Sequence, residues 1–204
     1  MFDQLGEGVF RRRYQSLDLN VGVVIGADGV LIIDTRASQR QAAELEAELK
    51  TLTDLPVRWV VNTHWHWDHT FGNAIFPGAE VWGHELCQIA LTQRGEYLKQ
   101  GAKEWLPPEQ HREIDEVEIV PPTETFSDRA SLDIGRAIEM TYHGFAHTDA
   151  DIVVSVGEAD VAFFGDINRR GVAPVVWGQL SSLLAPRLAP GIGASGRDRR
   201  AWSR

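Results

Sequence analysis

The 204-residue sequence predicts a layered α/β or α+β domain, in which β-sheets pack face to face and helices lie outside. Two observations lead to this prediction. Apolar runs of strand length occur near both ends of residues 1–168, and a helical segment with periodic apolar residues separates the first strands from the next one. The composition, 43% hydrophobic and 24% charged, is that of a globular protein.

The first expected elements are successive strands between Gly8 and Asp34. The apolar runs V-G-V-V-I-G and V-L-I-I-D are rich in β-branched residues, and A-D-G between them is a turn signal. Ser38 is a suitable N-cap for the helix expected next. The apolar residues of that helix recur at helical spacing: Ala42, Leu45, Leu49 and Leu52.

The middle of the chain is expected to hold a strand, a second strand and a helix. V-R-W-V-V-N, residues 57–62, has the pattern of a short buried strand. A strand around Glu80–Gly83 and a helix from about His84 to Gln100 follow. Lys103 to Thr123 is polar and contains two Pro-Pro pairs, so we expect a long excursion over the surface. Three strand candidates come last: A-I-E-M-T-Y-H, D-I-V-V-S-V and D-V-A-F-F-G.

A dense group of metal-ligand side chains follows the strand at residues 57–62. In N-T-H-W-H-W-D-H the ligand types are His64, His66, Asp68 and His69, so three of the seven histidines fall within six positions. A strand that ends in His-x-His would direct both imidazoles to one side, because side chains alternate along a strand. Imidazole and carboxylate groups are the ligands that Zn²⁺ and similar metals bind. The cluster therefore predicts a metal site.

T-H-x-H-x-D-H after a strand resembles the signature of the metallo-β-lactamase superfamily of metal-dependent hydrolases. Three further segments resemble motifs of this family in the expected order. They are V-L-I-I-D-T, which contains Asp34, then G-F-A-H-T-D-A-D-I-V-V, which contains His147, and F-F-G-D, which ends at Asp166. The resemblance runs from about Val21 to Asp166. It implies a four-layer αβ/βα sandwich whose C-terminal part is incomplete in this chain. It also implies a division into a hydrolase domain, residues 1–168, and an atypical tail, residues 169–204.

The resemblance also implies two adjacent metal sites. His64, His66 and His147 would form the first site, while Asp68, His69 and Asp166 would contribute to the second. Asp166 would bridge the two metals. Asp34 would support the ligand loop from behind without binding metal.

Such a centre would activate water for hydrolysis. Three neutral histidines leave a position open on the metal, where a bound water molecule is acidified and becomes a nucleophile. Asp68 is the candidate catalytic group, because it could orient the nucleophile and carry a proton to the leaving group.

One ligand of the family pattern is missing. The family supplies a last histidine some tens of residues after the bridging aspartate, but this chain has no histidine after His147. Residues 169–204 instead hold seven arginines, no lysine and one acid, whereas residues 1–168 are strongly acidic. Two explanations stay open: a shift of reading frame soon after codon 170, which we favour, and a genuine divergent ending.

The composition of the chain limits the kinds of partner that it is expected to bind. The net charge of −9 argues against a nucleic-acid surface, because phosphate binding needs clustered lysines and arginines. The single cysteine, the lack of a signal-peptide pattern and the lack of a long apolar run lead us to expect a cytoplasmic protein that binds no membrane. A small-molecule substrate is expected, and the oligomeric state is open. We expect Cys87, His84, His111 and His143 to be ordinary structural or surface residues.

The sequence therefore predicts a metal-dependent hydrolase with one or two zinc ions, acting on a small ester, thioester, lactone or amide. Its activity would be impaired by the missing ligand. Iron and manganese stay open as the metal. The alternatives are an iron-dependent oxidoreductase with the same fold and a metal-binding remnant without catalysis.

Overall fold

The computed structural model describes residues 1–167 and 177–178. The predicted separate tail, residues 169–204, lies outside the described residues except for residues 177–178, so its prediction stays a prediction. None of the helices in the described part of the chain is long and apolar enough to cross a lipid bilayer.

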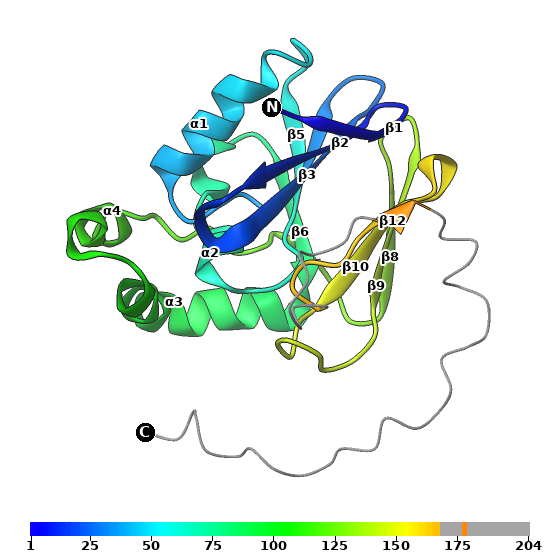
Figure 1. Ribbon diagram of the computed structural model, residues 1–204. Helices are drawn as coiled ribbons and strands as arrows, with labels where there is room; N and C mark the ends of the chain where they lie inside the picture. The colour runs from blue at the N-terminus through cyan, green and yellow to red at the C-terminus, as the bar shows by residue number, and fades with distance from the viewer. Residues whose placement is uncertain (168–176, 179–204) are drawn as a thin grey trace.

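A seven-stranded sheet forms the N-terminal half, with its strands in chain order from edge to edge (Figure 1). The first four strands pair antiparallel, and the fourth to the seventh pair parallel. The strands are β1 (Asp3–Gly6), β2 (Val9–Tyr14), β3 (Leu19–Ile25), β4 (Val30–Ile33), β5 (Val57–Val61), β6 (Glu80–His84) and β7 (Glu124–Phe126).

A five-stranded sheet forms the C-terminal half, in the order β12-β11-β10-β9-β8, and all its neighbours pair antiparallel. Its strands are β8 (Arg129–Asp133), β9 (Ala137–Tyr142), β10 (Ile152–Val156), β11 (Val161–Phe163) and β12 (Trp177–Gly178).

Helices flank the first sheet and its loops (Figure 1). The α-helices are α1 (Gln39–Leu49), α2 (Trp67–Thr70), α3 (Glu85–Trp105) and α4 (His111–Asp115). Short 3₁₀ turns are η1 (Ser16–Asp18), η2 (Asn73–Ile75), η3 (Pro108–Gln110) and η4 (Gly157–Ala159).

The core has two main layers because the central strands are apolar on both faces. Along β4, Leu31 and Ile33 point into the cluster between the two sheets, whereas Val30 and Ile32 point into the cluster beneath α1. This alternation is the period of two that a strand imposes. The predicted layered α/β class with sheets face to face is confirmed, and residues 1–167 provide one helical layer and both sheets of the expected sandwich.

The helix and strands that short sequence signals predicted are present in the structure. The Ser38 hydroxyl accepts a hydrogen bond from the backbone N–H of Gln41 at 3.2 Å, which makes Ser38 the predicted N-cap of α1. The three expected C-terminal strands correspond to β9, β10 and β11.

Two expectations for the middle of the chain need correction. Helix α3 continues to Trp105 instead of ending near Gln100. The expected surface excursion from Lys103 to Thr123 contains α4, in which Ile114 is buried against α3. Ile114 is the only apolar residue among the five residues of α4, so this small helix has no apolar periodicity of its own.

Candidate metal centre

The predicted ligands and their predicted support, Asp34, lie at one edge of the molecule, where four strands end. Asp34 directly follows β4, the His64 cluster follows β5, His147 lies in the β9–β10 connection, and Asp166 follows β11. Because β4 and β5 are parallel neighbours, their C-terminal ends meet at the same edge of the sheet. The second sheet brings its own two loops to this edge.

Three histidines form the first group. His64, His66 and His147 each offer a ring nitrogen, and these atoms lie within 4.8 Å of one another. His147 Nε2 lies 3.0 Å from His66 Nδ1. The ring centroids of His64 and His66 are 4.7 Å apart, and those of His64 and His147 are 5.2 Å apart. The three residues that sequence analysis assigned to one metal are therefore side by side.

A second group shares one histidine with the first. The ligand atoms of His64, His69 and Asp166 also lie within 4.8 Å of one another, and all three side chains are buried. Asp166 lies between the two groups: its Oδ1 is 3.6 Å from His69 Nε2, and its Oδ2 is 3.5 Å from His147 Nε2. One carboxylate oxygen is thus close to each group.

Asp68 lies beside the second group. Its Oδ2 is 3.7 Å from His69 Nε2, and its side chain is mostly buried at the start of α2. The structure therefore brings together all six residues that were predicted to bind metal.

Asp34 supports the ligands from behind, through both carboxylate oxygens. Oδ1 accepts a hydrogen bond from the backbone N–H of Thr63, and Oδ2 accepts one from the Thr63 hydroxyl, both at 2.8 Å. Because this hydroxyl gives its only proton to Asp34, it accepts from Nδ1 of His64 at 3.0 Å. The proton on Nδ1 leaves His64 Nε2 with the lone pair that a metal needs.

His69 lies in a strongly negative environment. Its Nδ1 is 2.7 Å from Asp34 Oδ2. Burial alone lowers the pKa of His69, but the carboxylates of Asp34, Asp68 and Asp166 outweigh this effect and raise the pKa to about 9. Three acids around one buried imidazole create a site that favours an added positive charge.

Glycine 165 allows Asp166 to approach the ligand loop. Gly165 has a positive φ of 53°, and a Cβ added there would lie 2.6 Å from the Thr63 hydroxyl oxygen. A side chain at this position would therefore push β11 and Asp166 away from Thr63 and His64.

One sequence argument for the cluster is wrong, although the imidazoles of His64 and His66 do lie side by side. Strand β5 ends at Val61, so His64 and His66 do not share a face by strand alternation. They lie in the turn before α2, where His66 is the residue preceding the helix. The backbone hydrogen bond from Ile152 N–H to the Thr63 carbonyl, 2.9 Å, fixes this turn against the second sheet.

The sequence analysis missed a buried amide pair at the base of the ligand loop. Asn62 Nδ2 donates to Asn73 Oδ1 at 3.1 Å, and Asn73 Nδ2 donates to Asn62 Oδ1 at 2.8 Å. The Thr35 hydroxyl also donates to Asn73 Oδ1, and Asn73 Nδ2 also donates to the Val120 carbonyl. Asn62 lies two positions before His64 and Asn73 four positions after His69, and this placement on both sides of the cluster was the available signal.

The remaining candidates are structural, as expected. His84 is the N-cap of α3, where its Nδ1 accepts from the Leu86 N–H, and Cys87 is buried in the core. His143 is exposed, and His111 Nε2 lies 3.0 Å from the Leu106 carbonyl.

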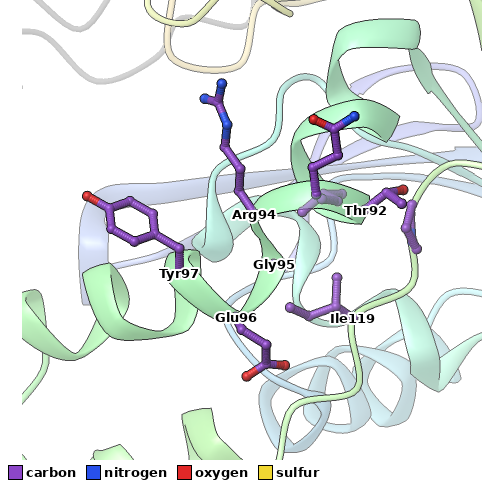
Figure 2. Close-up of a pocket in the computed structure, with 9 residues that line it drawn as sticks. Thr92, Arg94, Gly95, Glu96, Tyr97 and Ile119 are labelled. Atoms are coloured by element: carbon purple, nitrogen blue, oxygen red, sulfur yellow. The ribbon is translucent and has the colours of Figure 1, made fainter.

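A groove of about 420 Å³ lies elsewhere, along the middle of α3 (Figure 2). It is lined by residues 91–97 together with Ile119 and Pro121. None of the clustered histidines and aspartates lines this groove, so it does not belong to the metal centre.

The donor set fits a divalent metal ion. Histidine nitrogens and carboxylate oxygens converge in two groups, and Asp34 orients ligands from behind, as outer partners do in metal centres. These residues therefore fit a divalent metal site.

Known structures share this fold. A metallo beta lactamase from Hirschia baltica superposes with a TM-score of 0.58 at 20% identity, covering 80% of this chain and 69% of that chain. A metallo-beta-lactamase from Pontibacter korlensis gives 0.60 at 20% identity, with 80% and 70% covered. TMB-1 gives 0.59 at 21% identity, with 81% and 69% covered. These likenesses show the fold.

The family is shown by the sequence itself. No protein of curated function matches the chain. The profile described as the metallo-beta-lactamase superfamily matches residues 17–202, which is most of the sequence and includes every residue of the metal centre. This match shows that the chain belongs to the metallo-beta-lactamase superfamily, and its fold and two ligand groups agree with that family.

Proposed function

We propose that the chain is a zinc-dependent hydrolase of a small ester, thioester, lactone or amide. The observation that carries this proposal is the pair of ligand groups that share His64 and are spanned by Asp166. Superfamily membership supports the hydrolytic reaction, and the preponderance of imidazole ligands supports zinc.

The residues divide into two holding sets. His64, His66 and His147 would hold one ion, and Asp68, His69 and Asp166 would hold a second. When bound, divalent ions supply a Lewis acid for the substrate carbonyl and lower the pKa of a bound water molecule. Asp166 would keep the two ions adjacent, because each of its oxygens lies near a different set.

Asp68 is the proposed proton carrier. It lies in the first turn of α2 at the edge of the second set, and its Oδ2 is 3.7 Å from His69 Nε2. A carboxylate there can accept a proton from the attacking water and deliver it to the leaving group. Asp34 is excluded from this role because both of its oxygens already accept hydrogen bonds from Thr63.

Turnover of a substrate panel tests the proposal. Protein freed of metal and then loaded with Zn²⁺ should hydrolyse at least one ester, thioester, lactone or amide in the panel, and the double variant His64→Ala, His66→Ala should not. His143→Ala is the matched control, because this exposed histidine lies outside both ligand groups.

Two outcomes would contradict the proposal. Metal-loaded protein that turns over no member of the panel would indicate metal binding without this chemistry. Protein that is active only with iron, and shows visible absorption from the iron, would indicate redox chemistry instead.

A further inference from the structure

The two loops that carry the histidines of the first group belong to different sheets. His64 and His66 follow β5 of the seven-stranded sheet, whereas His147 lies between β9 and β10 of the five-stranded sheet. The distance between His66 and His147 therefore depends on contacts between the two loops.

A hydrogen bond at the rim of the site joins the loops. Trp65 Nε1 donates to Asp149 Oδ1 at 2.8 Å, across 84 positions of sequence. The acceptor is a carboxylate, which strengthens such a bond. At the base of the site, the backbone bond from Ile152 to Thr63 joins the same loops. His66 directly follows Trp65, and His147 lies two positions before Asp149, so both histidines are close in sequence to the rim hydrogen bond.

Asp149 is itself held in place by the second sheet. The Tyr142 hydroxyl donates to the Asp149 carbonyl at 3.1 Å and so closes the loop that carries His147. The Tyr142 ring stacks on the ring of His84, with centroids 4.0 Å apart and planes inclined by 28°. His84 is buried at the start of α3, so Asp149 is anchored through Tyr142 to a rigid part of the fold.

Trp65 connects Asp149 to the predicted metal ligand His66. Its ring meets the His66 ring edge to face, with centroids 4.5 Å apart and an interplanar angle of 86°. The indole is thus fixed at its nitrogen by Asp149 and contacts His66 with its ring. Any loosening of the Trp65–Asp149 bond would free the His66 ring to move relative to His147.

We propose that Trp65 and Asp149 are positioning residues, which form a latch that holds His66 and His147 at metal-binding distance. This inference rests on the proposed function only in that the three histidines bind a metal ion. It concerns the affinity and geometry of the first site, and it requires no particular substrate.

Conservative variants isolate the hydrogen bond. Trp65→Phe keeps an aromatic ring beside His66 but removes the N–H donor. Asp149→Asn keeps an oxygen acceptor at the same place, and Asp149→Ala removes it. Trp67→Phe is the matched control, because Trp67 begins α2 two positions further on and, like Trp65, packs partly buried against the apolar cluster near α3. Thermal unfolding of each metal-free variant verifies that it is folded.

Calorimetric titration with Zn²⁺ gives the affinity, and the visible spectrum of bound Co²⁺ reports the geometry at the metal. Trp65→Phe and Asp149→Ala should each weaken the tighter site about three- to tenfold, the effect of one exposed hydrogen bond. Both should alter the Co²⁺ spectrum. Asp149→Asn and Trp67→Phe should stay within about twofold of wild type, and the double variant Trp65→Phe, Asp149→Ala should lose no more than either single variant.

The latch is refuted if Trp65→Phe binds Zn²⁺ as tightly as wild type with an unchanged Co²⁺ spectrum. It is also refuted if Asp149→Asn loses as much affinity as Asp149→Ala, since that would assign the effect to the charge of Asp149. Losses that add in the double variant would show that the two residues act separately. If the wild-type protein itself binds no metal, the proposed function fails, and this outcome is distinct from the others.

Discussion

The carboxylate of Asp34 lies 2.7 Å from Nδ1 of His69, and both side chains are almost fully buried. The same carboxylate accepts two hydrogen bonds from Thr63, whose hydroxyl in turn orients His64. Asp34 therefore fixes one histidine of each ligand group. Its backbone is in the left-handed region, with φ of 66°, which directs its side chain under the ligand loop.

Asp34→Asn should weaken metal binding strongly. The amide keeps the shape of the side chain but loses the negative charge and one acceptor, so the orientation of His64 and His69 is no longer fixed. Loss of such an outer partner lowers metal affinity about 10- to 100-fold. Equilibrium dialysis against buffered Zn²⁺ measures the change, with the exposed Asp54→Asn as control. Equal affinity in the two variants would contradict the role of Asp34.

Gly165→Ala should destabilise the fold at the metal centre. Its Cβ would approach the Thr63 hydroxyl oxygen to 2.6 Å, at a residue whose φ of 53° already disfavours a side chain. We expect a loss of about 1–3 kcal/mol in the free energy of unfolding. Urea denaturation measures it. Gly78→Ala is the matched control, because nothing lies within 4 Å of a Cβ at that position, and a similar loss in both variants would rule out the steric explanation.

Asn73→Asp should open the base of the ligand loop. The change replaces the amide that donates to Asn62 and to the Val120 carbonyl with a carboxylate that can only accept. Buried acceptors would then face one another, at a cost of about 2–4 kcal/mol in the free energy of unfolding. Urea denaturation at neutral pH measures this cost. Gln93→Glu, the same chemical change at an exposed position of α3, should be close to neutral.

Tyr14 should make stability depend on pH in the alkaline range. Its ring lies between two guanidinium groups, with Arg36 3.7 Å and Arg12 4.6 Å from the ring centroid. Burial raises the pKa of Tyr14 to about 12, whereas an unfolded tyrosine ionises near pH ~10. The folded state holds this proton more tightly, so its contribution is complete below pH ~10 and is lost as the pH rises toward about 12.

Urea midpoints of wild type and Tyr14→Phe between pH 8 and about 11.5 test this prediction. Wild type should lose stability with rising pH more steeply than Tyr14→Phe, which has no proton to lose at this position. The exposed Tyr97→Phe is the control and should follow wild type. Parallel curves for wild type and Tyr14→Phe would contradict the assignment.

Elements set by local chemistry could be predicted from the sequence. The hydroxyl of Ser38 and the spacing of Ala42, Leu45 and Leu49 define α1 without reference to the rest of the chain. Strands β7 and β8 were missed because they are short and largely exposed, so they show no apolar run. Their formation depends on pairing with β6 and β9.

The ligands of the metal centre and one support, Asp34, were predicted from the sequence, but the other supporting residues were not. Ligand residues can be recognised in a sequence where several fall within a few positions, as do His64, His66 and His69. The partners that orient them are ordinary residues whose roles arise only from tertiary contact. Trp65 and Asp149 are separated by 84 positions, and no local pattern relates them. The strand argument for His64 and His66 was wrong because β5 ends at Val61, where the chain turns to bring His69 over Asp34.

The measurement that tests the central claim most directly is the number of tightly bound Zn²⁺ ions per chain in wild type and in His64→Ala. His64 belongs to both ligand groups, whereas exposed His143 belongs to neither. After dialysis against metal-free buffer and reloading, wild type and His143→Ala should retain at least one ion per chain, and folded His64→Ala should retain fewer ions than wild type. A wild-type protein without bound zinc, or a His64→Ala variant that retains the wild-type amount, would contradict the account.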